Sequence, residues 1–141
     1  MTSRFVYASI VAAALLASVM AVPAYAQTSV SQTKPILKDS LGRGLDEGNA
    51  ESIVILSTTI ENNTSNAVPF IALMEVRDWE GSTVYIQFQL GELPSRGESE
   101  LGISWTPAIA GQYELRTFLI SSFVDPVEIL TPVQQNIITI N

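Results

Sequence analysis

Seven segments of the chain alternate between apolar and polar residues with a period of two. Successive side chains of a strand point to opposite faces, so this alternation predicts strands with one face against a core and one toward solvent. Glycine, proline and asparagine are concentrated between the segments, as expected for turns. No segment after residue 27 shows helical periodicity. The predicted strands are residues 35–37, 52–62, 68–78, 84–90, 101–106, 113–120 and 137–140.

Short strands that follow one another without intervening helices are typical of antiparallel sandwiches. The pattern therefore predicts an all-β fold, a seven-stranded antiparallel Ig-like β-sandwich. At its centre, Trp105 is expected to fill the core, and Pro107 to end its strand because proline has no N–H to donate. Gly111 is expected to permit the bend into the next strand. Tyr113 is expected to hydrogen-bond to nearby backbone, as in a tyrosine corner.

The clearest alternation is in residues 84–90, which follow a hairpin connection at residues 78–81. Its apolar positions are Val84, Ile86, Phe88 and Leu90. The positions between them are Tyr85, Gln87 and Gln89. We expect the apolar set to face the core and the other set to face solvent. Residues 27–32 are expected to be frayed, and residues 39–49, 91–99 and 122–132 to be loops.

The first 26 residues have the pattern of a signal peptide, with Arg4 before an apolar run at residues 5–22. Small residues then match a cleavage site between Ala26 and Gln27. The predicted organisation is a signal-peptide helix at 1–26, an N-terminal segment with a short edge strand and loop at 27–50, and an Ig-like domain at 51–141. Nothing after residue 27 is long and apolar enough to span a membrane. The alternative is an uncleaved N-terminal anchor, because the apolar run approaches the roughly 20 residues that span a bilayer.

The composition of this 141-residue chain argues against several kinds of partner and catalytic site. It has 7 Lys and Arg against 14 Asp and Glu, and an acidic surface disfavours nucleic acid. It has no cysteine, which excludes disulfides, and no histidine, which removes the commonest general base and metal ligand. Nucleophile-elbow, zinc-protease and phosphate-loop motifs are also absent, so we expect no enzyme activity and no cofactor.

The carboxylates in the predicted turns do not have the spacing of a calcium loop. They are Asp78, Glu80, Asp125 and Glu128. We therefore expect them to be solvated and predict no metal site.

Two kinds of candidate site remain. Asn62 and Asn63 begin overlapping glycosylation sequons, although asparagine also suits a turn for its backbone preferences alone. Trp79 at the hairpin tip is a candidate contact for a partner or a glycan, with folding onto the next loop as the alternative. The candidate contact set also includes Tyr85, Gln87 and Gln89.

From Ser52 onward, four ordered segments resemble a known family. They are residues 58–64, Asp78 with Gly81, residues 104–107 and residues 110–116. This set resembles the CARDB-type Ig-like domains of secreted prokaryotic cell-surface proteins. Residues 103–107 and 116–122 are also similar to segments of exported proteins of ammonia-oxidising archaea. The chain has one such unit where CARDB-like domains often occur in tandem, and it has no cysteine pair.

The export signal, the sandwich pattern and the resemblance together predict a non-enzymatic, extracytoplasmic module. Its partner is expected to be an envelope or extracellular protein, contacted through a strand edge or the Trp79 hairpin. The first alternative is a module that binds glycans or small ligands through exposed aromatics. A second alternative is a structural subunit that assembles by strand donation.

Overall fold

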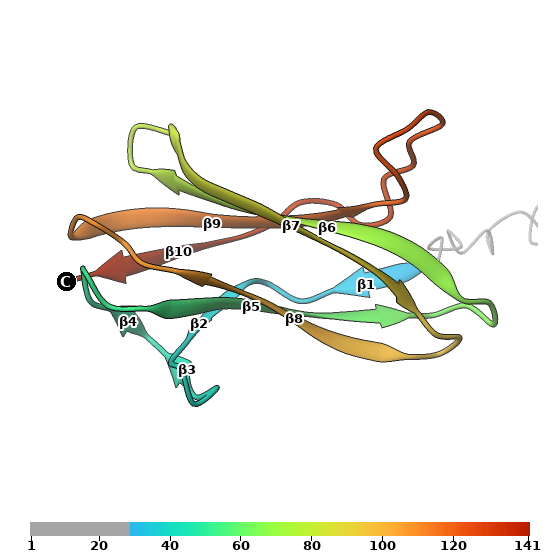
Figure 1. Ribbon diagram of the computed structural model, residues 1–141, viewed down its shortest axis with the longest axis horizontal. Coiled ribbons are helices and arrows are strands. Elements are labelled where there is room, and N and C mark those ends of the chain that lie inside the picture. Colours follow the sequence, from blue (N-terminus) through green and yellow to red (C-terminus); the bar gives the residue numbers. More distant parts are fainter. Residues whose placement is uncertain (1–28) are drawn as a thin grey trace, which may run out of the picture.

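The computed structural model describes residues 29–141, which form two five-stranded sheets packed face to face (Figure 1). The predicted signal peptide and its cleavage site between Ala26 and Gln27 lie outside the described residues. Within the described part of the chain there is no helix, and therefore none that could cross a membrane. The all-β sandwich is confirmed, with ten strands in place of the predicted seven.

The first sheet is built around β5 (Val54–Asn62). One side of β5 pairs with β8 (Glu98–Trp105), and the other side pairs with β1 (Val30–Gln32) and β2 (Ile36–Lys38). β3 (Gly44–Leu45) extends the sheet beyond β2.

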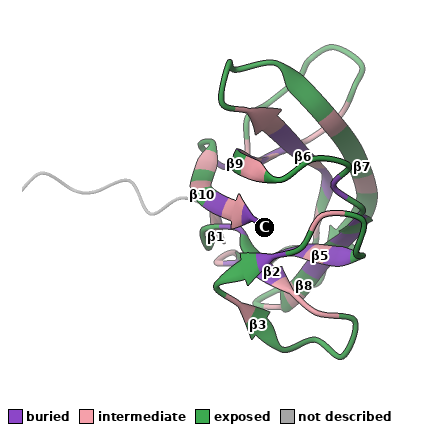
Figure 2. Cartoon of the chain, turned by 90° about the vertical axis from the view of Figure 1, so that its left-hand side faces the viewer, coloured by how far each residue is buried: buried purple, intermediate pink, exposed green. Residues whose placement is uncertain are grey.

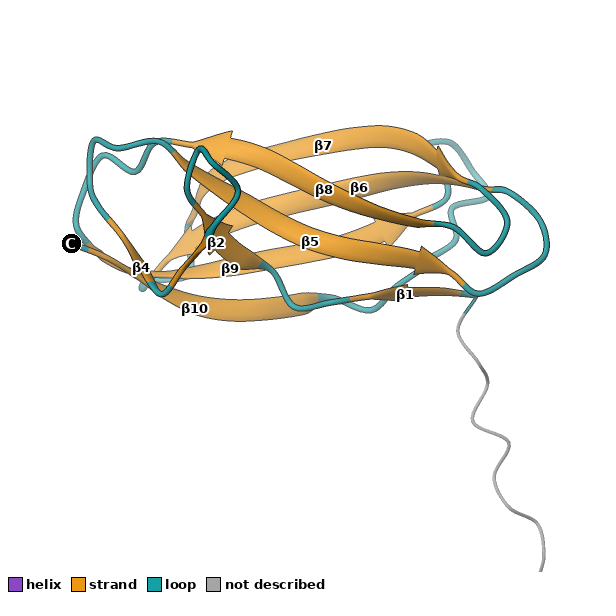
Figure 3. Cartoon of the chain, turned by 90° about the horizontal axis from the view of Figure 1, so that it is seen from below, coloured by secondary structure: helices purple, strands orange, loops and turns teal. Residues whose placement is uncertain are grey.

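The second sheet has the order β4-β10-β9-β6-β7. Its strands are β4 (Glu47–Gly48), β10 (Gln134–Ile140), β9 (Gly111–Ile120), β6 (Val68–Asp78) and β7 (Thr83–Leu93). A hairpin joins the antiparallel pair β6–β7, and the loop at 121–133 joins the antiparallel pair β9–β10. β7 and β8 are the last strands of their sheets on the same side of the sandwich (Figure 3).

The core lies between the sheets, and most strands contribute every second residue to it (Figure 2). On β8, Leu101, Ile103 and Trp105 are buried, as the alternation predicts. Apolar burial of this kind is the main favourable term in folding, at about 25 cal/mol per Å². Other fully buried core side chains are Val30, Leu37, Leu56, Ile60, Met74, Val76, Leu93, Leu115, Leu119 and Ile140.

The N-terminal segment takes part in both sheets. β2 lies at the strand predicted for residues 35–37, whereas β1, β3 and β4 lie in chain that was expected to be frayed or looped. Val30 is fully buried, and β1 pairs with residues 60–62 of β5. β4 lies in the segment expected to be a loop and pairs in parallel with β10, so the sandwich is not purely antiparallel. Strands of two or three residues are too short to show periodicity, which is why the sequence pattern missed them.

The orientation of β7 is opposite to the prediction. Its apolar side chains are exposed, by 48% at Val84, 54% at Ile86, 54% at Phe88 and 69% at Leu90. The register with β6 is the cause, because Phe88 pairs with the outward-facing Leu73 while Gln87 pairs with the buried Met74. Directly paired residues share a face of the sheet.

Candidate functional site

The outward face of β7 is an apolar stripe on the last strand of a sheet. We call Ile86, Phe88 and Leu90 the β7 stripe. Val84 is not part of it, because it lies at a β-bulge and borders a pocket together with Tyr85 and Trp105. Between Thr83 and Gly91 the strand carries no charged side chain, no lysine and no proline. Those are the features by which proteins usually discourage contacts at a strand edge. A long apolar edge without them indicates either a docking surface or a liability for aggregation.

Apolar side chains on neighbouring elements widen the stripe. Phe88, Leu73 and Phe118 form one row across β7, β6 and β9 on the outer face. The Phe123 ring meets the Phe88 ring edge-on, with centroids 5.3 Å apart and planes at 89°. The loop at 121–133 also exposes Val124, Val127, Ile129 and Val133. The sequence pattern predicted a loop at residues 122–132 but did not identify it as part of a contact surface. Its five exposed apolar residues, unusual for a loop, were the available signal.

A charged cluster lies next to the stripe. Glu75 is buried on the outer face and pairs in the ladder with both Ile86 and Arg116. Its carboxylate accepts hydrogen bonds from Arg77 Nε at 2.9 Å, from Arg116 Nη1 at 3.0 Å and from the Thr83 hydroxyl. Burial opposes ionisation, but these hydrogen bonds and the two guanidinium charges outweigh it and lower the pKa of Glu75 below its usual value. The cluster anchors the start of β7 to β6 and β9.

The inner face of β7 reaches across to β8. Tyr85 Oη donates to the carbonyl oxygen of Ser104 at 2.7 Å, and Gln89 Nε2 donates to that of Gly102 at 3.0 Å. These bonds satisfy backbone acceptors on the free side of β8. Gln87 lies between them on the same face of β7 and is exposed. The predicted contact residues Tyr85 and Gln89 therefore join the two sheets.

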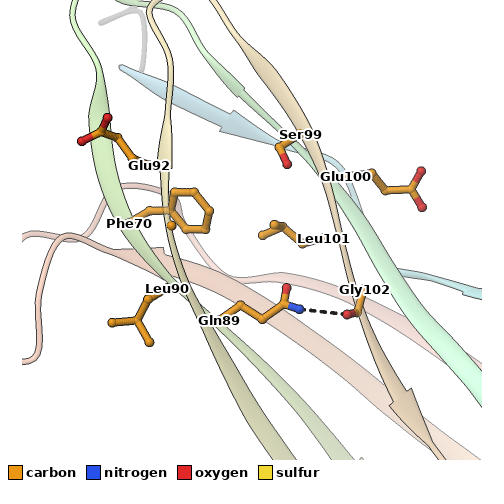
Figure 4. A pocket seen from close by; sticks show the side chains of 9 residues that line it. Phe70, Gln89, Leu90, Glu92, Ser99, Glu100, Leu101 and Gly102 are labelled. Atoms are coloured by element: carbon orange, nitrogen blue, oxygen red, sulfur yellow. Dashed lines mark hydrogen bonds between the residues drawn. The ribbon is translucent and has the colours of Figure 1, made fainter.

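A groove of about 680 Å³ opens where Gln89 bridges the strands (Figure 4). Phe70 and Leu101 form its floor, and the carboxylates of Glu92 and Glu100 point away from it. The Gln89 Oε1 atom is buried without a hydrogen-bond partner. The groove is open to solvent, so it does not resemble an enclosed ligand site.

Trp79 lies at the tip of the β6–β7 hairpin and is 81% exposed. It borders a groove of about 280 Å³ together with Gln112, Glu114 and Ile137. The structure thus separates Trp79 from Tyr85, Gln87 and Gln89, which were grouped with it as one contact set. Asp78 Oδ1 accepts backbone hydrogen bonds from Glu80 at 3.0 Å and Ser82 at 2.8 Å, which shapes the hairpin.

The two asparagines that begin the sequons differ in how far they are buried. Asn62 is buried, and its Nδ2 donates to the carbonyl oxygens of Asn66, Leu93 and Pro94 at 2.7, 3.3 and 3.0 Å. Its Oδ1 accepts from the backbone and hydroxyl of Thr64. Sugar attachment would replace one of the two hydrogens on that nitrogen and add bulk at a buried atom, so the folded turn disfavours modification of Asn62. Asn63 is half-buried.

The residues expected to be structural lie together at one end of the core. Trp105 and Tyr113 are buried with their rings edge-to-face, 5.1 Å apart. Tyr113 Oη donates to the carbonyl oxygen of Ile109 at 2.7 Å, which is the geometry of a tyrosine corner. Gly111 has a φ of 156°, a conformation that side chains rarely allow.

The four turn carboxylates do not converge. Asp78 and Glu80 lie in the β6–β7 hairpin, whereas Asp125 and Glu128 lie in the 121–133 loop. Among residues 29–141, no three acidic side chains gather into a possible metal site.

Comparison with known proteins supports the fold. No family model matches the sequence, and no curated protein is similar to it. The fold is similar to the C-terminal domain of Wzt, with a TM-score of 0.65 and 8% identity over 82% of this chain and 75% of that one. A β-glucosidase from Erythrobacter marinus matches with a TM-score of 0.57 and 13% identity, over 81% of this chain but only 16% of the enzyme.

A third similar structure belongs to the family suggested by the sequence segments. It is the CARDB domain of a Pyrococcus furiosus protein in complex with di-metal ions. The TM-score is 0.55 at 15% identity, over 79% of this chain and 89% of that domain. Identities this low establish architecture alone. The chain is an Ig-type β-sandwich with a CARDB-like fold.

Proposed function

We propose that this protein is a non-enzymatic, extracytoplasmic module that binds other proteins at the cell envelope through β7. The observation that carries the proposal is the β7 stripe, an apolar surface on an uncovered strand edge. Soluble proteins seldom expose contiguous apolar area without a use for it, and an open edge offers backbone hydrogen bonds to an incoming strand. Location outside the cytoplasm is supported by the leader pattern in residues 1–26 and by the CARDB-like fold.

Site-specific photo-crosslinking in the producing cells tests this function. A benzophenone amino acid at position 88 should give a discrete adduct on irradiation. The same probe at position 135 is the control, because Gln135 is exposed on the outer face of the same sheet and lies outside the Trp79 groove. Ile86→Glu should reduce the adduct at position 88. Equal labelling at both positions, or none at position 88, would count against a contact surface on β7.

Export can be measured directly in the same cells. The mass of the purified chain should correspond to a mature N-terminus at Gln27. Retention of residues 1–26 with membrane association would instead support the N-terminal anchor.

A second candidate function is glycan binding at the Trp79 hairpin. The exposure of this indole beside the groove with Gln112 and Glu114 favours it, because sugars stack on exposed aromatic faces and hydrogen-bond to nearby polar groups. A glycan array should then show saccharide binding that Trp79→Ala abolishes without changing the melting temperature. Binding that survives Trp79→Ala would remove this candidate.

Asn63 is the remaining candidate for an N-linked sugar. Ser65 completes its sequon and is exposed, whereas Thr64 is tied to Asn62. In a glycosylating host, Ser65→Ala should therefore remove a glycan-sized mass increment without disturbing the turn. An unmodified wild-type mass would reject the modification.

A further inference from the structure

The groove beside Trp79 is bordered by carboxylates, and we infer that the saccharide it binds is an amino sugar with a free, protonated amine. The inference rests on glycan binding, the second candidate function, and names the class of sugar. Three features of the β6–β7 hairpin and its neighbours carry it: the exposure of the indole, the fixed backbone of the turn and the charges around the groove.

The Trp79 indole is open to a ligand. Among residues 29–141 it is the most exposed of the large apolar side chains, at 81%. It lies at the end of the sandwich where β9 begins and β10 ends (Figure 1). The aromatic pairs of the described chain, Phe88 with Phe123 and Trp105 with Tyr113, do not include it. Its ring face is therefore available, and an indole face attracts cations more strongly than other aromatic rings.

The turn holds the backbone of Trp79 in place before a ligand binds. Asp78 Oδ1 accepts hydrogen bonds from the backbone nitrogens of Glu80 and Ser82, and the Asp78 carbonyl oxygen accepts one from Gly81 at 3.0 Å. Gly81 has a φ of 84°, in the left-handed region that glycine adopts at no steric cost. Because Trp79 lies inside this closed turn, little backbone entropy remains to be lost on binding.

Two acidic side chains line the groove, and no basic side chain does. They are Asp78 and Glu114, with Gln112 as a neutral polar neighbour and Ile137 as an apolar one. Asp78 uses only Oδ1 in the turn, so Oδ2 accepts no hydrogen bond from residues 29–141. Glu114 forms no ion pair within the same residues. A ligand with a positive charge is therefore favoured here, and one with a carboxylate is repelled.

The basic residue closest in register does not neutralise the groove. Arg77 is opposed to Glu114 in the β6–β9 ladder, so the two share a face of the sheet. Arg77 Nε donates instead to the buried Glu75 at 2.9 Å, where Arg116 also binds. The formal net charge of −7 has the same sign as the groove. The whole surface therefore adds to the attraction that a cationic ligand experiences.

An amino sugar fits the indole and the carboxylates together. The C–H face of its ring stacks on Trp79, and its ammonium group donates hydrogen bonds to the carboxylates of Asp78 and Glu114. The groove volume of about 280 Å³ is near the lower end of small-molecule sites, which suits one sugar residue better than a long stretch of chain. Acetylation of the amine removes the charge, and a uronic acid reverses it. The groove therefore selects the sugar by its charge.

Calorimetric titration of the purified protein with matched sugars tests this preference at about pH 6, where an amine is protonated. A short glucosamine oligomer should bind roughly ten times more tightly than the N-acetylated oligomer of the same length, and added salt should reduce the difference. Glu114→Gln should weaken binding of the glucosamine oligomer about tenfold and leave that of the N-acetylated oligomer unchanged. Glu92→Gln is the matched control, because it removes an exposed carboxylate at the other end of β7 and should change neither affinity. Both variants should keep the wild-type melting temperature.

The same titrations separate failure of this inference from failure of glycan binding itself. Equal affinity for the two oligomers, or an unchanged affinity of Glu114→Gln for the glucosamine oligomer, overturns the inference. Glycan binding at the hairpin still stands in that case if Trp79→Ala abolishes it. If neither oligomer binds, both fail. A lysine peptide that binds more tightly than the glucosamine oligomer, and that needs Trp79 and Glu114, would replace the sugar with a basic protein segment.

Discussion

β7 and β8 are neighbouring edge strands, yet they present opposite surfaces. β8 turns Leu101, Ile103 and Trp105 inward and exposes only glycine, serine and glutamate on its outer face. β7 turns Ile86, Phe88 and Leu90 outward and its tyrosine and glutamines inward, and Leu93 at its end is buried in the core. Period-two alternation is equally clear in both, so the alternation alone does not reveal which face is buried.

The free edges of β7 and β8 also differ, in the hydrogen bonds and charges that they carry. Two carbonyl oxygens of β8 accept hydrogen bonds from Tyr85 and Gln89, and Glu100 on its outer face pairs with Lys38. That lysine and the Ser57 hydroxyl lower the pKa of Glu100, which keeps a negative charge on β8. β7 carries no charge along its stripe, where the Phe123 ring packs edge-on against Phe88. Side chains of β7 thus cover the free edge of β8, whereas the free edge of β7 pairs with no strand among residues 29–141.

The largest difference in stability is expected between the loss of one aromatic residue of β8 and the loss of one of β7. Trp105→Ala should cost about 3–5 kcal/mol of unfolding free energy, because it leaves a cavity in the core. Phe88→Ala should cost less than about 1 kcal/mol, because half of that side chain is exposed. Urea unfolding of the monomer measures both. Similar costs for the two variants would mean that β7 is packed against the core after all.

An intermediate effect is expected at Glu75, which anchors the start of β7. Glu75→Gln should destabilise the fold by about 1–3 kcal/mol at pH 7, since it weakens charge-assisted hydrogen bonds. A lowered pKa in the folded state means that the unfolded chain binds the proton more readily. This stabilisation is therefore present above the ordinary glutamate pKa of about 4.3 and is lost as the pH falls below it.

Unfolding at pH 7 and pH 3 provides the control for that prediction. The difference between wild type and Glu75→Gln should shrink at pH 3. A difference of the same size at both pH values would contradict the assignment to the ionised carboxylate.

The smallest effects are expected at the bridges between the strands. Tyr85→Phe should cost about 1 kcal/mol, the worth of one hydrogen bond. Gln89→Met should cost less than Tyr85→Phe, because it also removes the buried, unpaired Oε1 atom. Thermal melts of the two variants rank them. The reverse order would indicate that Gln89 Oε1 has a partner in solution.

The sequence predicted the sandwich and the inward face of β8 because burial there is continuous and the strands are long. It could not predict the facing of β7, which depends on the pairing of Phe88 with Leu73 and of Gln87 with Met74. Nor could it predict β1 and β4, whose pairing with β5 and β10 is a long-range contact of only two or three residues. The candidate contact residues were therefore chosen on the wrong face of β7, as Tyr85, Gln87 and Gln89 together with Trp79 at the hairpin tip, and the β7 stripe was expected in the core.

The buried amide of Asn62 has a consequence for association at the far end of β7. By donating to the carbonyl oxygens of Leu93 and Pro94, it holds the last residues of that strand in place against the neighbouring turn. A partner that docks there therefore contacts backbone that has already lost its conformational entropy on folding. Little ordering entropy remains to oppose docking, so even a small contact area can yield measurable affinity.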